Sequence, residues 1–374
     1  MLCCSSNCIA TTSISCLFCC RGCNADKLRN EFTFLPPQSS YAVEFHKGAR
    51  ESVGRLVYSI ETLRSYNIYM EASEHATVDI VETSRGSRIP LVWLRRPRSQ
   101  VASSPSGKAP MVMIHCHGNA TDIGMMMGLY FEFVRQLDVE VVGVEYSGYG
   151  VSSGSPSYRD LLADADAAYN FVVSKGVPRE RIIVYGQSVG SGPAVGLAAK
   201  FKCGGVILHS AMLSAIKVLD PEPKKCCRPS CFFGCFDFFR NEKLLALMDA
   251  PSFVIHGQLD QTVPFYHGHD LWSTLPEAIR WPAYFPRAGH NDVIEFNSTS
   301  FFDEVSNFIR HVEDRVRRGV DVVKPPQICM TDATRASKAN SGEKLPFKEP
   351  VVGPQDSRHQ DLRVSPMPLG RKAA

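Results

Sequence analysis

Long hydrophobic runs are missing from this sequence of 374 residues. No stretch approaches the ~18 consecutive apolar residues that a membrane-spanning helix needs. The first residues also lack the positively charged start of a secretory signal, and their apolar stretch is short and interrupted by Ser and Thr. These absences argue against a membrane span and against secretion, and they favour a reducing, cytosolic compartment.

A strong excess of one charge is missing as well. The chain has 41 Lys and Arg against 38 Asp and Glu, which gives a formal net charge of +3. Residues 320–374 hold nine Lys and Arg against six Asp and Glu, so the excess lies in the tail and the body is close to neutral. We therefore expect no binding to nucleic acid. A hydrophobic content of 44% with 21% charged residues is typical of a soluble globular core.

Cysteine is concentrated in two places. Seven of the 14 cysteines lie in the first 23 residues, and four more lie between Cys226 and Cys235. Three interpretations of the N-terminal cluster compete: a zinc site, although no His is present and the C-x2-C pairs are crowded; a disordered start; and reversible S-palmitoylation. We favour palmitoylation, because several acyl chains give a stable membrane anchor. The predicted acylation sites are Cys3, Cys4, Cys8, Cys16, Cys19, Cys20 and Cys23.

Residues 186–190 read Gly-Gln-Ser-Val-Gly and contain the best candidate nucleophile, Ser188. An apolar, β-branched run at 181–185 predicts a buried strand before them, and small residues at 191–200 predict a helix after them. A G-x-S-x-G turn between a strand and a helix is typical of a nucleophile elbow, which holds its serine in a strained backbone conformation. Gly186 and Gly190 are expected where a Cβ would strike the neighbouring strand or helix.

A second predicted strand, 111–115, leads into Cys116, His117, Gly118 and Asn119. A strand that ends in His-Gly followed by a small polar residue is typical of the loop that binds the oxyanion in acyl transfer. We expect the backbone N–H groups of Val189 and Asn119 to form this oxyanion hole. An ordinary strand-to-helix turn with Asp122 as helix N-cap is compatible with the same residues.

The candidate acid and base follow Ser188 in the chain. Asp260 comes just after a predicted strand at 252–256, and His290 comes just after another at 281–285. The order Ser188, Asp260, His290, with each residue at a strand end, is the order found in α/β-hydrolases. His209, at the end of a predicted strand at 205–209, is interpreted as a hydrogen-bonded residue without a catalytic role.

The remaining pattern completes an α/β prediction. A hairpin is expected at 76–94, a strand at 139–146, a capped helix at 157–174 and an amphipathic helix at 300–316. The predicted fold is a mostly parallel central sheet flanked by helices. We expect an anchoring segment at 1–35, a hydrolase domain at 36–318 and a disordered polar tail at 319–374.

The insert at about 220–240, rich in Cys and Phe, is expected to form a small cap over the pocket. Its aromatic residues could line an acyl channel or hold the cap down. Its four cysteines could form a second acylated patch or a zinc site.

The specific motifs resemble those of the α/β-hydrolase-domain-containing 17 proteins, between about residues 75 and 316. The resemblance rests on 117–122 (HGNATD), 145–150 (EYSGYG), 185–190 (YGQSVG), 256–257 (HG) and 289–292 (GHND). It implies a membrane-attached protein depalmitoylase with Ser188, Asp260 and His290 as its triad and with no metal or cofactor. The substrates would be S-acylated proteins on the cytoplasmic face of the plasma membrane or endosomes. The insert and the long tail depart from the family pattern and leave the choice of substrate open.

Two other classes of function remain. A hydrolase of lipids or small esters, or a peptidase, would use the same three residues. A non-catalytic hydrolase fold could serve as a membrane-bound interaction protein, although the complete set of motifs argues against it. The sequence leaves the oligomeric state, the acyl-chain length and the membrane undetermined.

Overall fold

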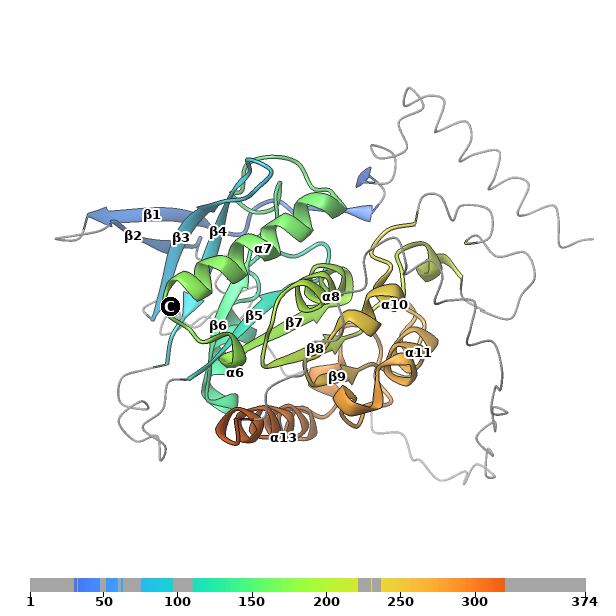
Figure 1. Cartoon of the computed structure of the whole chain (residues 1–374). Helices are drawn as coiled ribbons and strands as arrows, with labels where there is room; N and C mark the ends of the chain where they lie inside the picture. The colour runs from blue at the N-terminus through green and yellow to red at the C-terminus, as the bar shows by residue number, and fades with distance from the viewer. Residues whose placement is uncertain are drawn as a thin grey trace, which may run out of the picture. The chain divides into compact units, whose positions relative to one another are not determined.

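The computed structural model describes residues 30–31, 33–47, 52–59, 62, 75–96, 110–220, 230 and 237–319 (Figure 1). All of these belong to one of two compact units, Met1–Gln327. The other unit, Ile328–Ala374, lies outside the described residues. The N-terminal cysteine cluster, most of the 220–240 insert and the tail predicted after 319 also lie outside them.

The described strands form one sheet in the order β1-β2-β3-β4-β6-β5-β7-β8-β9. Strands β1 to β4 pair antiparallel, and β4 also pairs antiparallel with β6. All pairs from β6 to β9 are parallel. The bounds are β1 Ala42–Lys47, β2 Ser52–Val57, β3 Ala76–Glu82, β4 Arg88–Leu94, β5 Met111–Cys116, β6 Val139–Val144, β7 Ile182–Gln187, β8 Gly205–His209 and β9 Ser252–Ile255.

Helices cover both faces of the parallel part (Figure 1). Along β5, Val112 and Ile114 face one core cluster with α7 and α8, whereas Met111 and Met113 face a second cluster with α6 and α13. A strand buried on both faces is apolar at most positions, which explains the hydrophobic run of β5 before His115. The bounds are α6 Met127–Leu137, α7 Tyr158–Ser174, α8 Ser191–Lys200, α10 Asn241–Leu244, α11 Tyr266–Thr274, α12 Val293–Phe296 and α13 Ser298–Arg317.

This architecture confirms the predicted fold class. The hairpin at 76–94 is β3 and β4, paired antiparallel. Helix α7 begins where predicted, with the Ser157 hydroxyl accepting from the Asp160 N–H at 3.1 Å. Helix α13 buries Phe301, Val305 and Phe308, as its periodicity indicates.

The expected last strand, 281–285, is wrong as a continuous strand. Only two isolated parallel bridges join this region to β9, from Arg280 to Ser252 and from Tyr284 to Ile255. Pro282 and Pro286 lie within or beside the segment. Because proline has no N–H to donate, it interrupts the hydrogen bonding of a strand. The segment nevertheless runs beside β9, bridged to its first and last residues, and brings the following loop to the edge of the sheet.

Two Phe residues of the insert lie among the described residues. Phe238 and Phe239 are buried, and their rings lie 6.1 and 6.4 Å from that of Phe34. They also contact Tyr158 at the start of α7. These two residues therefore belong to a cluster that holds the end of the insert on the body.

The turn after β7 has the strained geometry that its sequence predicts. Ser188 has φ of +52°, a left-handed conformation that non-glycine residues adopt at a cost of about 1–3 kcal/mol. A Cβ on Gly186 would lie 2.5 Å from the Ala194 Cβ in α8. A Cβ on Gly190 would overlap the carbonyl oxygen of Cys116 at the end of β5. The turn thus forms only because both positions lack a side chain.

We predict that Gly190→Ala lowers the free energy of unfolding by about 1–3 kcal/mol, because the added methyl group meets backbone that cannot move aside. Gly196→Ala, in the following helix α8, is the matched control, since its Cβ would meet only the flexible tip of Leu162. The control should be as stable as the wild type or slightly more so. Urea unfolding measures both, and equal midpoints for Gly190→Ala and wild type would contradict the prediction.

Candidate active site

Ser188 is presented at the carboxyl end of the central strand β7. It follows Gln187, the last residue of that strand, and its side chain is half-buried. The Ser191 hydroxyl donates to the Ser188 carbonyl at 2.6 Å and accepts from the Met212 N–H at 3.3 Å. Ser191 therefore joins the turn to the segment after β8. The sequence analysis did not predict these two contacts of Ser191.

The structure brings Ser188, His290 and Asp260 into one hydrogen-bonded row. The Ser188 Oγ lies 3.1 Å from His290 Nε2, and His290 Nδ1 lies 2.7 Å from Asp260 Oδ2. The Asp260 carboxylate is buried, whereas 12% of the His290 side chain is exposed. Because a carboxylate accepts the proton on Nδ1, Nε2 is left as the acceptor that faces the serine hydroxyl.

Asp260 is held as a carboxylate by several donors. Its Oδ1 accepts from the N–H groups of Thr262 and Val263 at 2.9 and 2.8 Å. Burial raises the pKa of Asp260, but hydrogen bonds from His256 and His290 outweigh it and hold the pKa well below its usual range. The His256 Nε2 lies 3.4 Å from Asp260 Oδ2 and 2.8 Å from the Val263 carbonyl oxygen. His256 is thus a second histidine that contacts the Asp260 carboxylate, and the sequence analysis predicted only His290 there.

The loops that carry Asp260 and His290 are fastened to each other. The Gln258 N–H donates to the Pro286 carbonyl at 2.8 Å, and the Leu259 N–H donates to that of Ala288 at 2.9 Å. A Cβ on Gly257 would overlap the Ala288 carbonyl oxygen. This close contact fixes the separation of acid and base despite the interrupted strand at 281–285.

His209 has a different role from His290. Its Nδ1 lies 2.6 Å from the Tyr185 hydroxyl, and its ring is buried behind the row of three residues. Burial lowers the pKa of His209 to about 3, with the neighbouring His290 and His256 acting in the same direction. The ring is therefore neutral, and the structure confirms it as a hydrogen-bonded residue at the end of β8.

The expected oxyanion loop lies beside the serine. A Cβ on Gly118 would stand 3.8 Å from the Ser188 Cβ, so this loop lies in contact distance of Ser188. Val189 follows Ser188 in the turn, and its side chain is buried. The Asn119 side chain points to other partners: its Oδ1 accepts from the Leu35 N–H at 3.0 Å and from the Tyr149 hydroxyl at 2.7 Å.

Residues 33–41, here called the strap, lie across this loop. The Asn119 side-chain amide donates to the Thr33 carbonyl. Asp122 accepts from the Ser40 N–H at 2.7 Å and from its hydroxyl at 2.6 Å, and it also accepts from the Met125 N–H at 2.9 Å as a cap of the following turn. The Tyr41 hydroxyl donates to Glu145 at 2.8 Å. The sequence pattern does not predict these hydrogen bonds of the strap, because they join residues more than 80 positions apart and follow no local periodicity.

The part of the chain that the structure describes contains no cluster of three or more His, Cys, Asp or Glu side chains able to hold a metal ion. Within the same residues, no helix combines the length and hydropathy needed to cross a bilayer. The predicted acylation sites between Cys3 and Cys23 and the cysteines of the insert lie outside the described residues. Cys116 and Cys203 are buried free thiols.

The chain resembles known hydrolases in sequence and in fold. The family described as Hydrolase_4, serine aminopeptidase S33, matches residues 107–229. An esterase of Pyrococcus furiosus, Pf2001, superposes with a TM-score of 0.51 over 74% of this chain and 99% of its own, at 15% identity, which shows a shared fold.

Curated relatives share more of the sequence. Alpha/beta hydrolase domain-containing protein 17B from Xenopus tropicalis is 33% identical over 76% of this chain and 92% of its own length. The human 17B protein is 32% identical over the same shares. Protein 17C from Xenopus laevis is 31% identical over 79% of this chain and 93% of its own. These similarities extend over most of both chains, and the chain therefore belongs to the alpha/beta hydrolase domain-containing protein 17 family.

Proposed function

We propose that this protein is an acyl-protein thioesterase that removes S-palmitoyl groups from membrane-associated proteins by a Ser-His-Asp mechanism. The observation that carries the chemistry is the row from Ser188 through His290 to Asp260, with contacts of 3.1 and 2.7 Å. Membership of the family and the fold shared with an esterase support a serine hydrolase. The thioester substrate is a proposal from the family resemblance and the N-terminal cysteine cluster.

The reaction proceeds in two transfers of the acyl group. His290 Nε2 takes the Ser188 proton while Ser188 Oγ bonds to the thioester carbonyl carbon. The oxygen becomes negative, and the N–H groups of Val189 and Asn119 stabilise it. The carbon–sulfur bond then breaks, and the cysteine thiolate leaves with the bonding electron pair and takes the proton from His290, which becomes neutral again. Water attacks the acyl-enzyme, gives its proton to His290, and Ser188 recovers its proton as the fatty acid leaves.

The nature of the leaving group separates the proposal from its alternatives. A cysteine thiol has a pKa near 8.5, so its thiolate leaves with little help from a proton. An amine leaving group must be protonated by His290 before the carbon–nitrogen bond breaks. The Asp260 carboxylate stabilises the imidazolium that forms in either case. Turnover of matched thioester, ester and amide substrates with one acyl chain therefore discriminates a thioesterase from a lipid esterase or a peptidase.

We predict that Ser188→Ala, Asp260→Asn and His290→Ala each lower thioester turnover by about 10³–10⁶ without loss of folding. Labelling by a fluorophosphonate probe should disappear in Ser188→Ala. Asp292→Asn is the control, since Asp292 is a nearby carboxylate that accepts from the Gly289 N–H at 2.6 Å and does not contact His290 within the described hydrogen bonds. Near-normal turnover in Asp260→Asn together with a large loss in Asp292→Asn would transfer the role of acid to Asp292.

A membrane anchor at the N-terminus is the second part of the proposal. The body is close to neutral, so electrostatic attraction to anionic lipids would not keep it at a bilayer. Each buried CH₂ of an acyl chain adds ~0.8 kcal/mol, and two or more chains give stable attachment. Confinement to the membrane would also raise the effective concentration of enzyme and substrate. The site of action would be the cytoplasmic face of the plasma membrane or endosomes.

We predict that replacing the seven cysteines between Cys3 and Cys23 by Ser leaves hydrolysis of a soluble thioester unchanged. The same protein should move to the soluble fraction and lose action on membrane-bound substrates. Cell fractionation with acyl-exchange labelling measures both effects. A cysteine-free N-terminus that stays on membranes, or a wild-type N-terminus without acyl groups, would contradict the anchor.

A further inference from the structure

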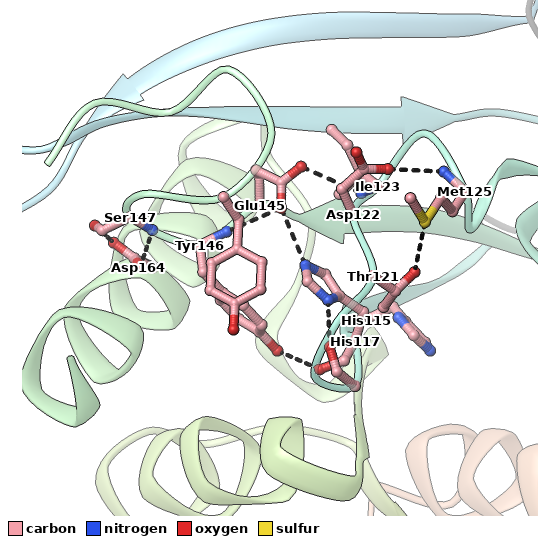
Figure 2. A network of polar contacts seen from close by, with 12 residues as sticks. His115, His117, Thr121, Asp122, Ile123, Met125, Glu145, Tyr146, Ser147 and Asp164 are labelled. Atoms are coloured by element: carbon pink, nitrogen blue, oxygen red, sulfur yellow. Dashed lines mark hydrogen bonds and ion pairs between the residues drawn. The ribbon is translucent and has the colours of Figure 1, made fainter. Parts of the chain in front are cut away.

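Beneath the proposed oxyanion loop lies a buried pair of side chains, His117 and Glu145. Both side chains have zero exposed surface, and His117 Nε2 lies 3.1 Å from Glu145 Oε1. Figure 2 shows the His117 ring between the Glu145 carboxylate and the turn that follows β5. The ring also packs against Tyr146, with centroids 4.2 Å apart. The ring therefore has no free rotation, and each of its nitrogens has a fixed neighbour.

Glu145 is fixed by donors from three parts of the chain. Its Oε2 accepts from the Tyr41 hydroxyl at 2.8 Å and from the Ile123 N–H at 3.2 Å. Its Oε1 accepts from the Tyr146 N–H at 3.3 Å in addition to His117. Burial, together with the Glu145 carboxylate, raises the pKa of Tyr41, so the phenol keeps its proton and remains a donor. A buried carboxylate with so many donors is a rigid support.

The other nitrogen of His117 reaches the loop itself. His117 Nδ1 lies 2.8 Å from the Gly118 carbonyl oxygen. A carbonyl oxygen only accepts, so Nδ1 carries a proton and donates. The Tyr146 hydroxyl donates to the preceding carbonyl, that of His117, at 2.7 Å.

Fixing the Gly118 carbonyl also fixes the next N–H group. In a trans peptide the C=O and the following N–H point in opposite directions across one rigid plane. The Asn119 N–H therefore points away from the His117 ring. Gly118 stands next to Ser188, since a Cβ on it would lie 3.8 Å from the Ser188 Cβ. The orientation of this one peptide decides whether the Asn119 N–H faces the reacting carbonyl oxygen.

We propose that His117, supported by Glu145, is a positioning residue that holds the Gly118–Asn119 peptide with its N–H directed at the oxyanion formed on Ser188. The inference rests on the proposed serine-hydrolase function. His117 does not touch the substrate. It acts through the peptide plane, and its contribution is present in the transition state, where the oxyanion has formed.

Two isosteric substitutions separate positioning from structural support. In His117→Gln the side-chain amide takes the place of Nε2, so it keeps the contact with Glu145 and loses the donor to the Gly118 carbonyl. In His117→Asn the amide takes the place of Nδ1, so it keeps that donor and loses Glu145. If His117 is a positioning residue, His117→Gln lowers kcat by about 10²-fold with little change in KM. His117→Asn should then have a kcat at least about tenfold higher than that of His117→Gln. A structural role predicts the reverse order.

Steady-state kinetics on a soluble thioester, with thermal unfolding of each variant, measures these effects. Wild type and Ser188→Ala are assayed first, since absent or Ser188-independent turnover would reject the proposed function itself. The positioning role is wrong if the wild type is active and His117→Gln has the wild-type kcat. It is also wrong if the kcat of His117→Asn does not exceed that of His117→Gln. Tyr146→Phe serves if the His117 variants do not fold. It removes one hydroxyl and should lower kcat about three- to tenfold at constant KM, and an unchanged kcat would overturn the inference.

Discussion

The close packing of β5 against β7 at their carboxyl ends is the constraint on which the site depends. At Gly190 the turn after β7 touches the backbone of Cys116 and His117, the last residue of β5 and the first residue of the loop. No Cβ fits there, so the Ser188 turn and the loop are held at backbone-contact distance. The short distance between the two elements results from the parallel pairing of β5 with β7, which runs from Val112 opposite Ile182 to Cys116 opposite Gly186.

The polar groups around this contact are buried, and burial makes each of them expensive unless it is paired. Glu145 illustrates how the chain meets that requirement, with donors from the strap, from the turn after β5 and from its own strand end. Removing one donor would leave part of a buried carboxylate uncompensated, which costs more than the hydrogen bond contributes. The same groups therefore make the loop rigid and make its geometry sensitive to single substitutions.

The strap gives the N-terminal part of the chain a direct connection to the site. Phe34 is buried against Phe238 and Phe239, while Leu35 and Ser40 bond to Asn119 and Asp122. The strap, which begins inside the predicted anchoring segment at 1–35, is thus part of the support of the proposed oxyanion loop. In this arrangement residues 33–41 and the loop beside Ser188 share one network of contacts.

Local pattern in the sequence was sufficient for much of this structure. The apolar runs within β5, β7, β8 and β9 indicate the parallel strands, because strands buried on both faces are apolar at most positions, with polar residues such as His115 and His209 near their carboxyl ends. The small residues around Ser188 determine the strained turn, since its φ of +52° and its crowded glycines follow from steric exclusion within a few residues. The order of Ser188, Asp260 and His290 indicated which side chains would share one edge of the sheet.

Only the tertiary structure decided how that edge is supported. Pro282 and Pro286 interrupt the expected strand at 281–285, yet contacts between the Asp260 and His290 loops hold these two side chains together. The bonds of Tyr41 to Glu145 and of Ser40 to Asp122 span 104 and 82 residues. Local sequence encodes burial period and turn chemistry, whereas such long-range hydrogen bonds depend on which surfaces meet after the sheet has formed. His117, Glu145 and His256 acquire their places at the site from that packing.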